Sequence, residues 1–360
     1  MEKPKYQILK EYIIDLIKIK ELNSGEKIFS ENELAEKFDI SRHTVRQAIG
    51  ELVTEGWIYR VQGKGTFVEK NTDDKLNLPK TIGVITTYIN DYIFPSIIRG
   101  IDSVLSTDGY NILLSCTYNQ HEKERICLEN MKNQNIVGLI VEPTKSALPN
   151  PNLDLYRELI EKKVQVLFIH GSYNTFDSSY VVEDDIEAGY LATKYLIDLG
   201  FTKIGGIFKM DDIQGHLRFA GFQKAFNEAS LSFPDSRIFW FNTDEIDNKF
   251  GNVGIDAFTD GLSDCSAIVC YNDEISVKII NAIRKKGLGI PEDISLVSFD
   301  DSQLASSSEI KLTSVAHPKE QLGIEAGKSI IGLINQNEKH YRVKMKPVLI
   351  VRGSTKNMKG

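Results

Sequence analysis

The sequence predicts an α/β protein in two parts: an N-terminal winged helix-turn-helix, and a larger two-lobed body of parallel sheets covered by helices. Residues 30–68 combine two short amphipathic helices with two short strands around a Gly-Lys-Gly tip. From residue 81 onward, apolar runs alternate with amphipathic helices, as in parallel sheets covered on both faces. The 360 residues also exceed one typical domain. We therefore expect a head at 1–70, a linker at 71–80 and a body at 81–360.

The head begins with three predicted helices. The first has an apolar face made by Leu9, Tyr12, Ile13, Leu16 and Ile17. Ser30 and Glu33 have the spacing of a capping box, so the second helix begins at residue 30. Asp39 and Ile40 form a tight turn, and Ser41 then caps the third helix.

The third helix carries side chains suited to DNA. Its buried face is Val45, Ala48, Ile49 and Leu52, and its other face is His43, Arg46, Gln47 and Gly50. Arg and Gln form paired hydrogen bonds with base edges in the major groove. Arg42 and Thr44 lie in the first turn, where free backbone N–H groups favour a phosphate. The alternative is a solvated, mildly basic helix of an ordinary helical domain.

The strands that follow predict a wing, which favours the DNA-reading interpretation. Gly63 and Gly65 permit the positive φ angles of a hairpin tip, and Lys64 between them is suited to a minor groove or a phosphate. Lys5 is placed to touch the DNA backbone, and Glu31 to accept from cytosine N4. The predicted DNA-binding residues are Lys5, Glu31, Arg42, His43, Thr44, Arg46, Gln47, Gln62, Gly63 and Lys64.

This head resembles the DNA-binding domain of the GntR family of regulators. The likeness is carried by KIFSENELAEKFDISRHTVRQAIGELVTEGWIYRVQGKGTFV, and the resemblance covers about the first fifth of the chain. The resemblance implies a homodimer on a pseudo-palindromic operator, with the first turns of the third helix in the major groove and the wing tip nearby.

Charge and composition place the nucleic-acid contact in the head alone. Residues 1–70 contain twelve Lys and Arg and twelve Asp and Glu, so the net charge of −7 falls entirely on the rest. No apolar run is long enough for a membrane span, and no signal-peptide core is present. The four cysteines show neither metal-ligand spacing nor pairing logic. We therefore expect reduced thiols and a cytoplasmic protein without a membrane partner.

Polar side chains follow many of the strands predicted in the body. The strands are expected at 81–88, 111–118, 138–143, 164–170, 203–208, 238–242, 267–272 and 294–301. Such folds bind ligands at the carboxyl ends of their strands. The side chains expected there are Tyr88, Tyr92, Glu142, His170, Asp184, Arg218, Asn272 and Asp300. Planar polar groups serve the vicinal hydroxyls of a sugar, and aromatic rings cover its C–H faces. Each residue alone is equally a loop residue or a helix cap.

From residue 81 to the end the chain resembles the effector-binding domain of the LacI/GalR repressors, which has the type I periplasmic-binding-protein fold. The likeness rests on TIGVITTY, GLIVEP, DDIEAGYLATKYLIDLGFTKIGGI, RFAGF, YNDEIS, ISLVSFDD and LTSVAHP. It implies ligand contacts at Asp184, Arg218, Asn272 and Asp300. It also implies three passages between lobes, expected near Lys194, His317 and Lys346. Lobe 1 would then span about 81–193 and 317–345, and lobe 2 about 194–316 and 346–360.

A GntR-type head on a LacI-type body resembles the arabinose-responsive repressors (AraR) of Gram-positive bacteria. SRHTVRQAIG, TTYINDYIFPSIIRGI, GLIVEPTKSALPNPN and CYNDEI carry this likeness. It implies a repressor of arabinose-uptake and -utilisation genes that L-arabinose releases from its operator, with no other cofactor. The alternative is a regulator of the same architecture that responds to another sugar or acts as an activator. The hinge helix of the LacI family is missing here.

Enzyme and transport functions are less consistent with the sequence. GIEAGKS (residues 323–329) has three residues between its glycines where a phosphate-binding loop needs four, and it falls in a predicted helix. The six histidines form no metal-binding pattern, and no GxSxG motif is present. No segment supports the aminotransferase-like body of some GntR-headed proteins. A sugar-binding protein of the transport type would need a secretion signal and would have no use for the head.

Overall fold

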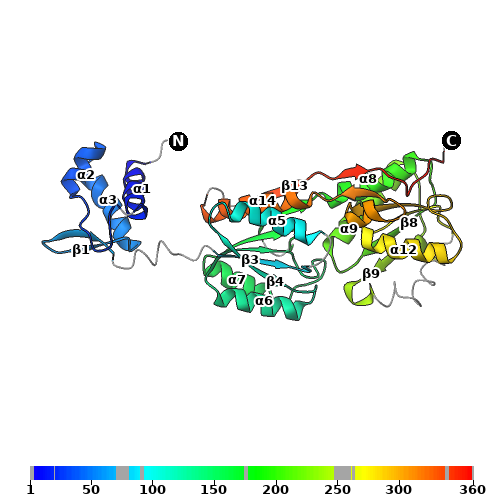
Figure 1. The fold of residues 1–360 in the computed structure, drawn as a ribbon, viewed down its shortest axis with the longest axis horizontal. Helices are drawn as coiled ribbons and strands as arrows, with labels where there is room; N and C mark the ends of the chain where they lie inside the picture. The colour runs from blue at the N-terminus through cyan, green and yellow to red at the C-terminus, as the bar shows by residue number, and fades with distance from the viewer. Residues whose placement is uncertain are drawn as a thin grey trace. The chain divides into compact units, whose positions relative to one another are not determined.

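A computed structural model describes residues 4–19, 21–69, 81–89, 93–173, 177–246, 261, 264–336 and 340–358. The chain forms two compact units, Met1–Pro79 and Lys80–Gly360. The expected linker, 71–80, lies outside the described residues. Figure 1 shows the helices and strands of both units.

The first unit is a three-helix winged head. Its elements are α1 Lys5–Lys18, α2 Glu31–Phe38, α3 Arg42–Thr54, β1 Ile58–Val61 and β2 Gly65–Val68. Both bonds of the capping box between Ser30 and Glu33 are present, and the Ser41 side chain accepts from the backbone N–H of Thr44. β1 and β2 pair antiparallel, and Gly63 and Gly65 at the tip have φ angles of 75° and 122°. These predictions are confirmed because capping and hairpin signals are local.

A single apolar core holds the head together. α1 contributes Leu9 and Ile13, α2 contributes Leu34, and α3 contributes the predicted face with Val45 and Leu52. All five side chains are fully buried. Packing one face of α3 against α1 and α2 leaves the opposite face of that helix exposed, which is the face that carries Arg46 and Gln47.

The second unit contains two six-stranded sheets (Figure 1). The sheet of lobe 1 has the order β13-β7-β6-β5-β3-β4, with all pairs parallel. The sheet of lobe 2 has the order β14-β12-β11-β10-β8-β9, parallel except for β14. The strands of lobe 1 are β3 Thr81–Thr86, β4 Asn111–Cys116, β5 Ile136–Val141, β6 Gln165–Ile169, β7 Ser179–Glu183 and β13 Arg342–Met345. Those of lobe 2 are β8 Ile204–Lys209, β9 Ile238–Phe241, β10 Ala267–Val269, β11 Ser295–Asp300, β12 Thr313–Ala316 and β14 Val348–Ile350.

Helices cover both sheets. Lobe 1 has α5 Phe94–Leu105, α6 His121–Asn133, α7 Leu153–Glu161 and α14 Lys319–Ile334. Lobe 2 has α8 Asp185–Asp198, α9 Ile213–Glu228, α12 Asp273–Lys285, α13 Gln303–Ser307 and the 3-10 turns Asp235–Arg237 and Thr243–Glu245. Most of the buried strand residues are apolar, as expected of sheets covered on both faces, although β11 and β12 also bury Ser295, Ser298, Thr313 and Ser314.

The chain passes between the lobes three times, and the first passage lies earlier than expected. It occurs at Asp184, between β7 and α8, and not near Lys194. The reason is that α8 packs on α9 and on β10, β11, β12 and β14, so the whole helix belongs to lobe 2. The other two passages lie at residues 317–318, before α14, and 346–347, between β13 and β14.

Glycines allow two pairs of helices to approach closely. A Cβ on Gly323 of α14 would lie 2.1 Å from the carbonyl oxygen of Ile97 on α5. GIEAGKS is therefore a helix-packing segment. A Cβ on Gly189 of α8 would lie 2.0 Å from the carbonyl oxygen of Arg218 on α9. This second contact fixes the position of Arg218.

Candidate functional site

The head exposes most of its predicted DNA-binding residues. Arg42, His43, Arg46 and Gln47 are exposed on α3, and Gln62, Gly63 and Lys64 are exposed at the wing. Thr44 is half-buried, and its hydroxyl lies 2.9 Å from that of Ser41. Lys5 is exposed and donates to the backbone oxygen of Asp39 at 3.3 Å.

Glu31 connects the recognition helix to the wing. Its Oε2 accepts from Nε of Arg46 at 2.7 Å, and its Oε1 lies 3.9 Å from Nη2 of Arg60 on β1. All three side chains are about one-third exposed or more, so they are accessible to a nucleic acid. A groove of about 590 Å³ between the start of α2 and the wing includes Lys27, Glu31, Arg60 and Gln62 in its lining. Glu31 therefore orients Arg46 in the free protein, in addition to its predicted contact with cytosine.

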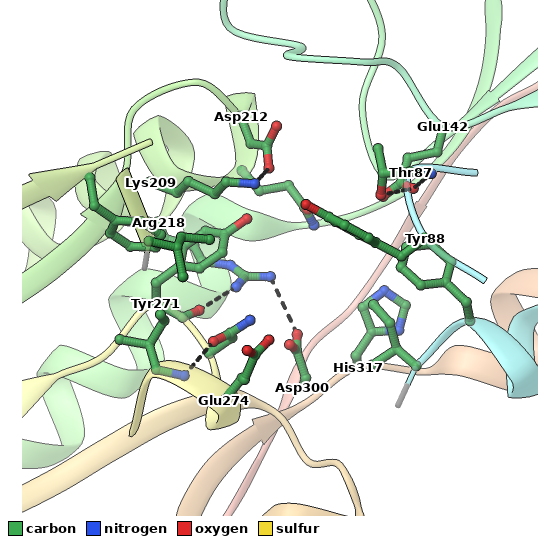
Figure 2. A pocket seen from close by; sticks show the side chains of 17 residues that line it. Thr87, Tyr88, Glu142, Lys209, Asp212, Arg218, Tyr271, Glu274, Asp300 and His317 are labelled. Atoms are coloured by element: carbon green, nitrogen blue, oxygen red, sulfur yellow. Dashed lines mark hydrogen bonds and ion pairs between the residues drawn. The ribbon is translucent and has the colours of Figure 1, made fainter. Parts of the chain in front are cut away.

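A cavity of about 260 Å³ lies between the two lobes of the body. Figure 2 shows Thr87, Tyr88 and Glu142 of lobe 1 opposite Lys209, Arg218 and Tyr271 of lobe 2. The full lining is Thr87, Tyr88, Ile93, Phe94, Glu142, Lys209, Asp212, Gln214, Arg218, Phe241, Ile246, Tyr271, Asn272, Glu274, Ile275, Asp300 and His317. Most of the polar members follow the carboxyl end of a strand.

Arg218 is the centre of the polar network in lobe 2. Its Nη1 donates to the carbonyl oxygen of Tyr271 at 2.7 Å, and its Nε donates to Oδ1 of Asp185 at 2.9 Å. Its Nη2 lies 3.8 Å from a carboxylate oxygen of Asp300 and equally far from one of Glu183. The rings of Tyr271 and Phe299 lie 5.1 Å and 4.5 Å from its guanidinium carbon. Arg218 is therefore held by four polar partners and two aromatic rings, and it also lines the cavity. Figure 2 shows its contacts with Tyr271 and Asp300.

Two of the three carboxyls around Arg218, those of Asp185 and Glu183, have raised pKa values because they are buried. Burial raises the pKa of Asp185, although Arg218 beside it acts in the opposite direction. Burial and the charge of Asp185 raise the pKa of Glu183 well above its usual range. Asp300 ends β11 with a φ of 94°, a backbone conformation that residues other than glycine rarely adopt. One guanidinium thus serves three carboxyls.

Lys209 forms the second cationic group of the cavity. Its Nζ lies 2.5 Å from Oδ2 of Asp212 and 3.9 Å from Oδ1 of Asp211. Burial opposes the charged form, but the two carboxylates outweigh it and raise the pKa of the ammonium. Lys209 and Asp212 both line the cavity, which presents a donor and an acceptor side by side.

Glu142 lies on the lobe 1 wall of the cavity, His170 lies behind it, and His317 lines the cavity at the second passage between the lobes. Glu142 accepts from the backbone N–H of Thr87 at 2.7 Å, and its other oxygen lies 3.0 Å from Nδ1 of His170. The rings of His170 and His317 are perpendicular, with centroids 4.9 Å apart. Burial and His170 lower the pKa of His317 well below its usual value, so its imidazole is neutral. Both ring nitrogens of His317 are buried without a hydrogen-bond partner among the described residues.

Five of the predicted effector-binding residues line this cavity: Tyr88, Glu142, Arg218, Asn272 and Asp300. Asn272 is also the N-cap of α12, where its side chain accepts from the N–H of Ile275. Two others do not line it. Asp184 caps α8 and lies 3.6 Å from Nζ of Lys344, and His170 lies behind Glu142. Tyr92 lies outside the described residues.

Seven polar residues of the lining were not predicted: Thr87, Lys209, Asp212, Gln214, Tyr271, Glu274 and His317. Lys209 ends β8, Asp212 and Gln214 follow it, and Glu274 lies two residues after Asn272. The signal for most of these was present, because they also end or follow strands, but the prediction included only some of the polar residues at each strand end. Asp185 had no such signal in the sequence. Only the orientation of α8 decides that Asp185, and not Asp184, contacts Arg218.

The cavity offers the chemistry that a small carbohydrate requires. Carboxylates accept from hydroxyls, and Arg218 and Lys209 donate to them. Tyr88, Phe94, Phe241 and Tyr271 supply aromatic surface for C–H groups. Within the described residues, no group of three or more His, Cys, Asp or Glu side chains is arranged to hold a metal ion. No helix in that part of the chain is both long and apolar enough to cross a membrane.

Comparisons with known proteins agree with this two-part organisation. Residues 5–68 match the family described as bacterial regulatory proteins, gntR family, and residues 193–355 match the periplasmic binding protein-like domain. A solved structure of the transcription regulator CcpA of Lactococcus lactis superposes with a TM-score of 0.68 at 25% identity, over 77% of this chain and 99% of that one.

Two curated relatives are similar over nearly the whole length. The arabinose metabolism transcriptional repressor of Halalkalibacterium halodurans is 43% identical over 343 residues, or 92% of each chain. The repressor of the same name from Geobacillus stearothermophilus is 40% identical over 358 residues, or 99% of this chain and 98% of its own. The chain therefore belongs to the family of arabinose metabolism transcriptional repressors.

Proposed function

We propose that this protein is a homodimeric repressor that binds pseudo-palindromic operators of arabinose-uptake and -utilisation genes in the cytoplasm, and that L-arabinose releases it. The names of the two full-length relatives support the gene target and the sugar. The exposed polar side chains of α3 and the wing support direct contact with DNA.

The cavity between the lobes is the observation that carries the proposal. It combines two buried cations, four carboxylates and aromatic rings in about 260 Å³, and His317 adds a neutral imidazole with unpaired nitrogens. A neutral imidazole supplies one donor and one acceptor, which suits a hydroxyl. Tyr88, Glu142, Arg218, Asn272 and Asp300 are the proposed sugar contacts, and Lys209, Asp212 and His317 extend the set.

Sugar binding would be linked to DNA release through closure of the lobes. A ligand that contacts both lobes binds the closed arrangement better than an open one, and it shifts the equilibrium by that difference in affinity. In a homodimer, closure changes how the two heads are presented, so they no longer match half-sites separated by whole helical turns. Asp184, His317 and Lys346 lie at the three passages where this movement is expected.

Fluorescence anisotropy with operator-length duplexes from arabinose gene promoters tests the whole proposal. We expect specific binding without sugar and loss of that complex on addition of L-arabinose. Calorimetric titration with a panel of pentoses and hexoses identifies the effector. A complex that persists at a saturating concentration of a sugar shown to bind would refute induction by that sugar.

A further inference from the structure

The two lobes are joined by polar contacts at the sheet edges farthest from the three passages. The passages adjoin β7 and β13 at one edge of the lobe 1 sheet, and β12 and β14 at one edge of the lobe 2 sheet. β4 and β9 form the opposite edges. Figure 1 shows β13 on the upper side of the body and β4 and β9 on the lower side. A contact between those remote edges opposes opening of the two lobes most strongly, because it lies farthest from the passages about which the lobes would move.

Asn119, three residues beyond β4, is the centre of these contacts. Its side chain is fully buried, and its backbone has a φ of 55°, which asparagine tolerates better than most residues. Its Oδ1 accepts from the N–H of Lys145 within lobe 1 at 2.7 Å. Its Nδ2 donates across to lobe 2, at 2.6 Å to Oγ1 of Thr243 and at 3.4–3.5 Å to Asp212 and Asp211.

The loop after β5 adds three more contacts between the lobes. Nζ of Lys145 lies 2.8 Å from Oδ2 of Asp244. The Ser146 hydroxyl accepts from the N–H of Ile213 at 2.9 Å, and the N–H of Ala147 donates to the carbonyl oxygen of Asp211 at 3.2 Å. These contacts and those of Asn119 are named here the far-edge latch.

A buried carboxylate holds the loop of the latch in place. Glu124 is fully buried, and its four hydrogen bonds come from Tyr156, Tyr173, Asn150 and Asn152. Asn150 and Asn152 belong to the same loop as Lys145, so lobe 1 presents its half of the latch on a rigid support.

We propose that the far-edge latch sets the sugar affinity, and hence the inducing concentration, through Asn119 and Lys145, which do not touch the sugar. The inference rests on the proposed function. Asn119 and Lys145 do not line the cavity, whereas Asp212 both lines it and accepts from Asn119. Each contact across the edges stabilises the closed arrangement, and a sugar that binds this arrangement gains the same free energy. Asn119 and Lys145 are positioning residues in this scheme.

Asn119→Asp is the sharpest test, because it keeps the size of the side chain and the oxygen that accepts from Lys145. It replaces the Nδ2 donor with an oxygen facing Asp211 and Asp212, so attraction becomes repulsion. We expect calorimetry to show sugar affinity reduced by about tenfold or more. Operator affinity without sugar is expected to be retained or raised, because loss of the latch favours the open arrangement, which is the one proposed to bind the operator.

Exchanging the charges of Lys145 and Asp244 supplies a second test, which remains informative if Asn119→Asp does not fold. Lys145→Asp is expected to weaken sugar binding by about threefold to fivefold, and adding Asp244→Lys should restore it. Lys132→Asp is the matched control, since Lys132 pairs with Glu158 at 2.7 Å entirely within lobe 1. That variant should leave sugar affinity unchanged.

Amide hydrogen exchange measures the stability of the far-edge latch in the absence of sugar. The amides of Ala147 and Ile213 donate across the lobes, so both should exchange faster in Asn119→Asp than in the unaltered protein. Unchanged exchange together with unchanged sugar affinity in both latch variants would overturn the latch. If the unaltered protein binds no pentose or hexose, the proposed function fails instead, and exchange still shows whether these contacts hold the lobes together.

Discussion

Nε of Arg218 donates to Oδ1 of Asp185 at 2.9 Å, and both side chains are at most 2% exposed. This bond ties α9 to the first turn of α8, at the point where the chain enters lobe 2. The carbonyl oxygen of Tyr271 and the carboxylate of Asp300 hold the other side of the guanidinium. Arg218 thus links the first passage between the lobes to the cavity wall.

Arg218→Ala is expected to remove sugar binding and to destabilise the body by about 3–5 kcal/mol, because it leaves Asp185 and Glu183 buried without a cation. Calorimetry and urea unfolding measure the two effects. Operator affinity without sugar should persist. Arg99→Ala is the control: its partner Glu320 is 2.9 Å away, but both side chains are more than half exposed, so less than about 1 kcal/mol is at stake. Retained sugar affinity in Arg218→Ala would remove Arg218 from the site.

Arg46→Ala and Lys64→Ala should weaken operator binding in different ways. If Arg46 reads a base, its loss costs about 1–3 kcal/mol for the operator and much less for unrelated DNA. Lys64 at the wing tip is expected to contact phosphate, so its loss should weaken all sequences alike and reduce the salt slope by about 1. Anisotropy titrations on both duplexes at several salt concentrations separate these outcomes. Equal losses on the two duplexes for Arg46→Ala would contradict base reading.

Gly189→Ala should disturb the cavity from outside it. The added Cβ would lie 2.0 Å from the carbonyl oxygen of Arg218, so α8 and α9 must move apart. We expect destabilisation of about 1–3 kcal/mol and weaker sugar binding, because the bond from Arg218 to Asp185 is displaced. In Gly353→Ala the nearest atom is 3.8 Å away, and that variant should retain the properties of the unaltered protein. Thermal unfolding and calorimetry decide, and full sugar affinity in Gly189→Ala would contradict this view of the helix pair.

Asp273 should make stability depend on pH near 6. Burial and the neighbouring Asp300 raise its pKa from 3.8 to about 6, against hydrogen bonds from Ser302. The folded protein therefore binds this proton more tightly than the unfolded chain does. The contribution of Asp273 to stability is full below about pH 4 and is lost as the pH rises through 6, a change on the order of 3 kcal/mol. Urea unfolding at several pH values should show a smaller decline in Asp273→Asn, and identical slopes would rule out this titration.

Local patterns in the sequence determined the head almost completely. The capping box of Ser30 and Glu33, the cap at Ser41 and the glycines of the wing involve residues within a few positions of one another. The apolar face of α3 likewise leaves only one face free for DNA. For the same reason, the sequence predicted the apolar strands of the body and the polar side chains that follow their carboxyl ends.

Only the tertiary structure decided which of those polar side chains meet. Asp184 and Asp185 are adjacent carboxylates at the start of one helix, and successive helical residues point about 100° apart. The packing of α8 on α9 directs Asp185 to Arg218, whereas Asp184 caps the helix. The same packing assigns α8 to lobe 2 and moves the first passage to Asp184. The far-edge latch is of this kind, since Asn119 and Thr243 lie 124 positions apart and meet only because β4 and β9 are the outer strands of two facing sheets.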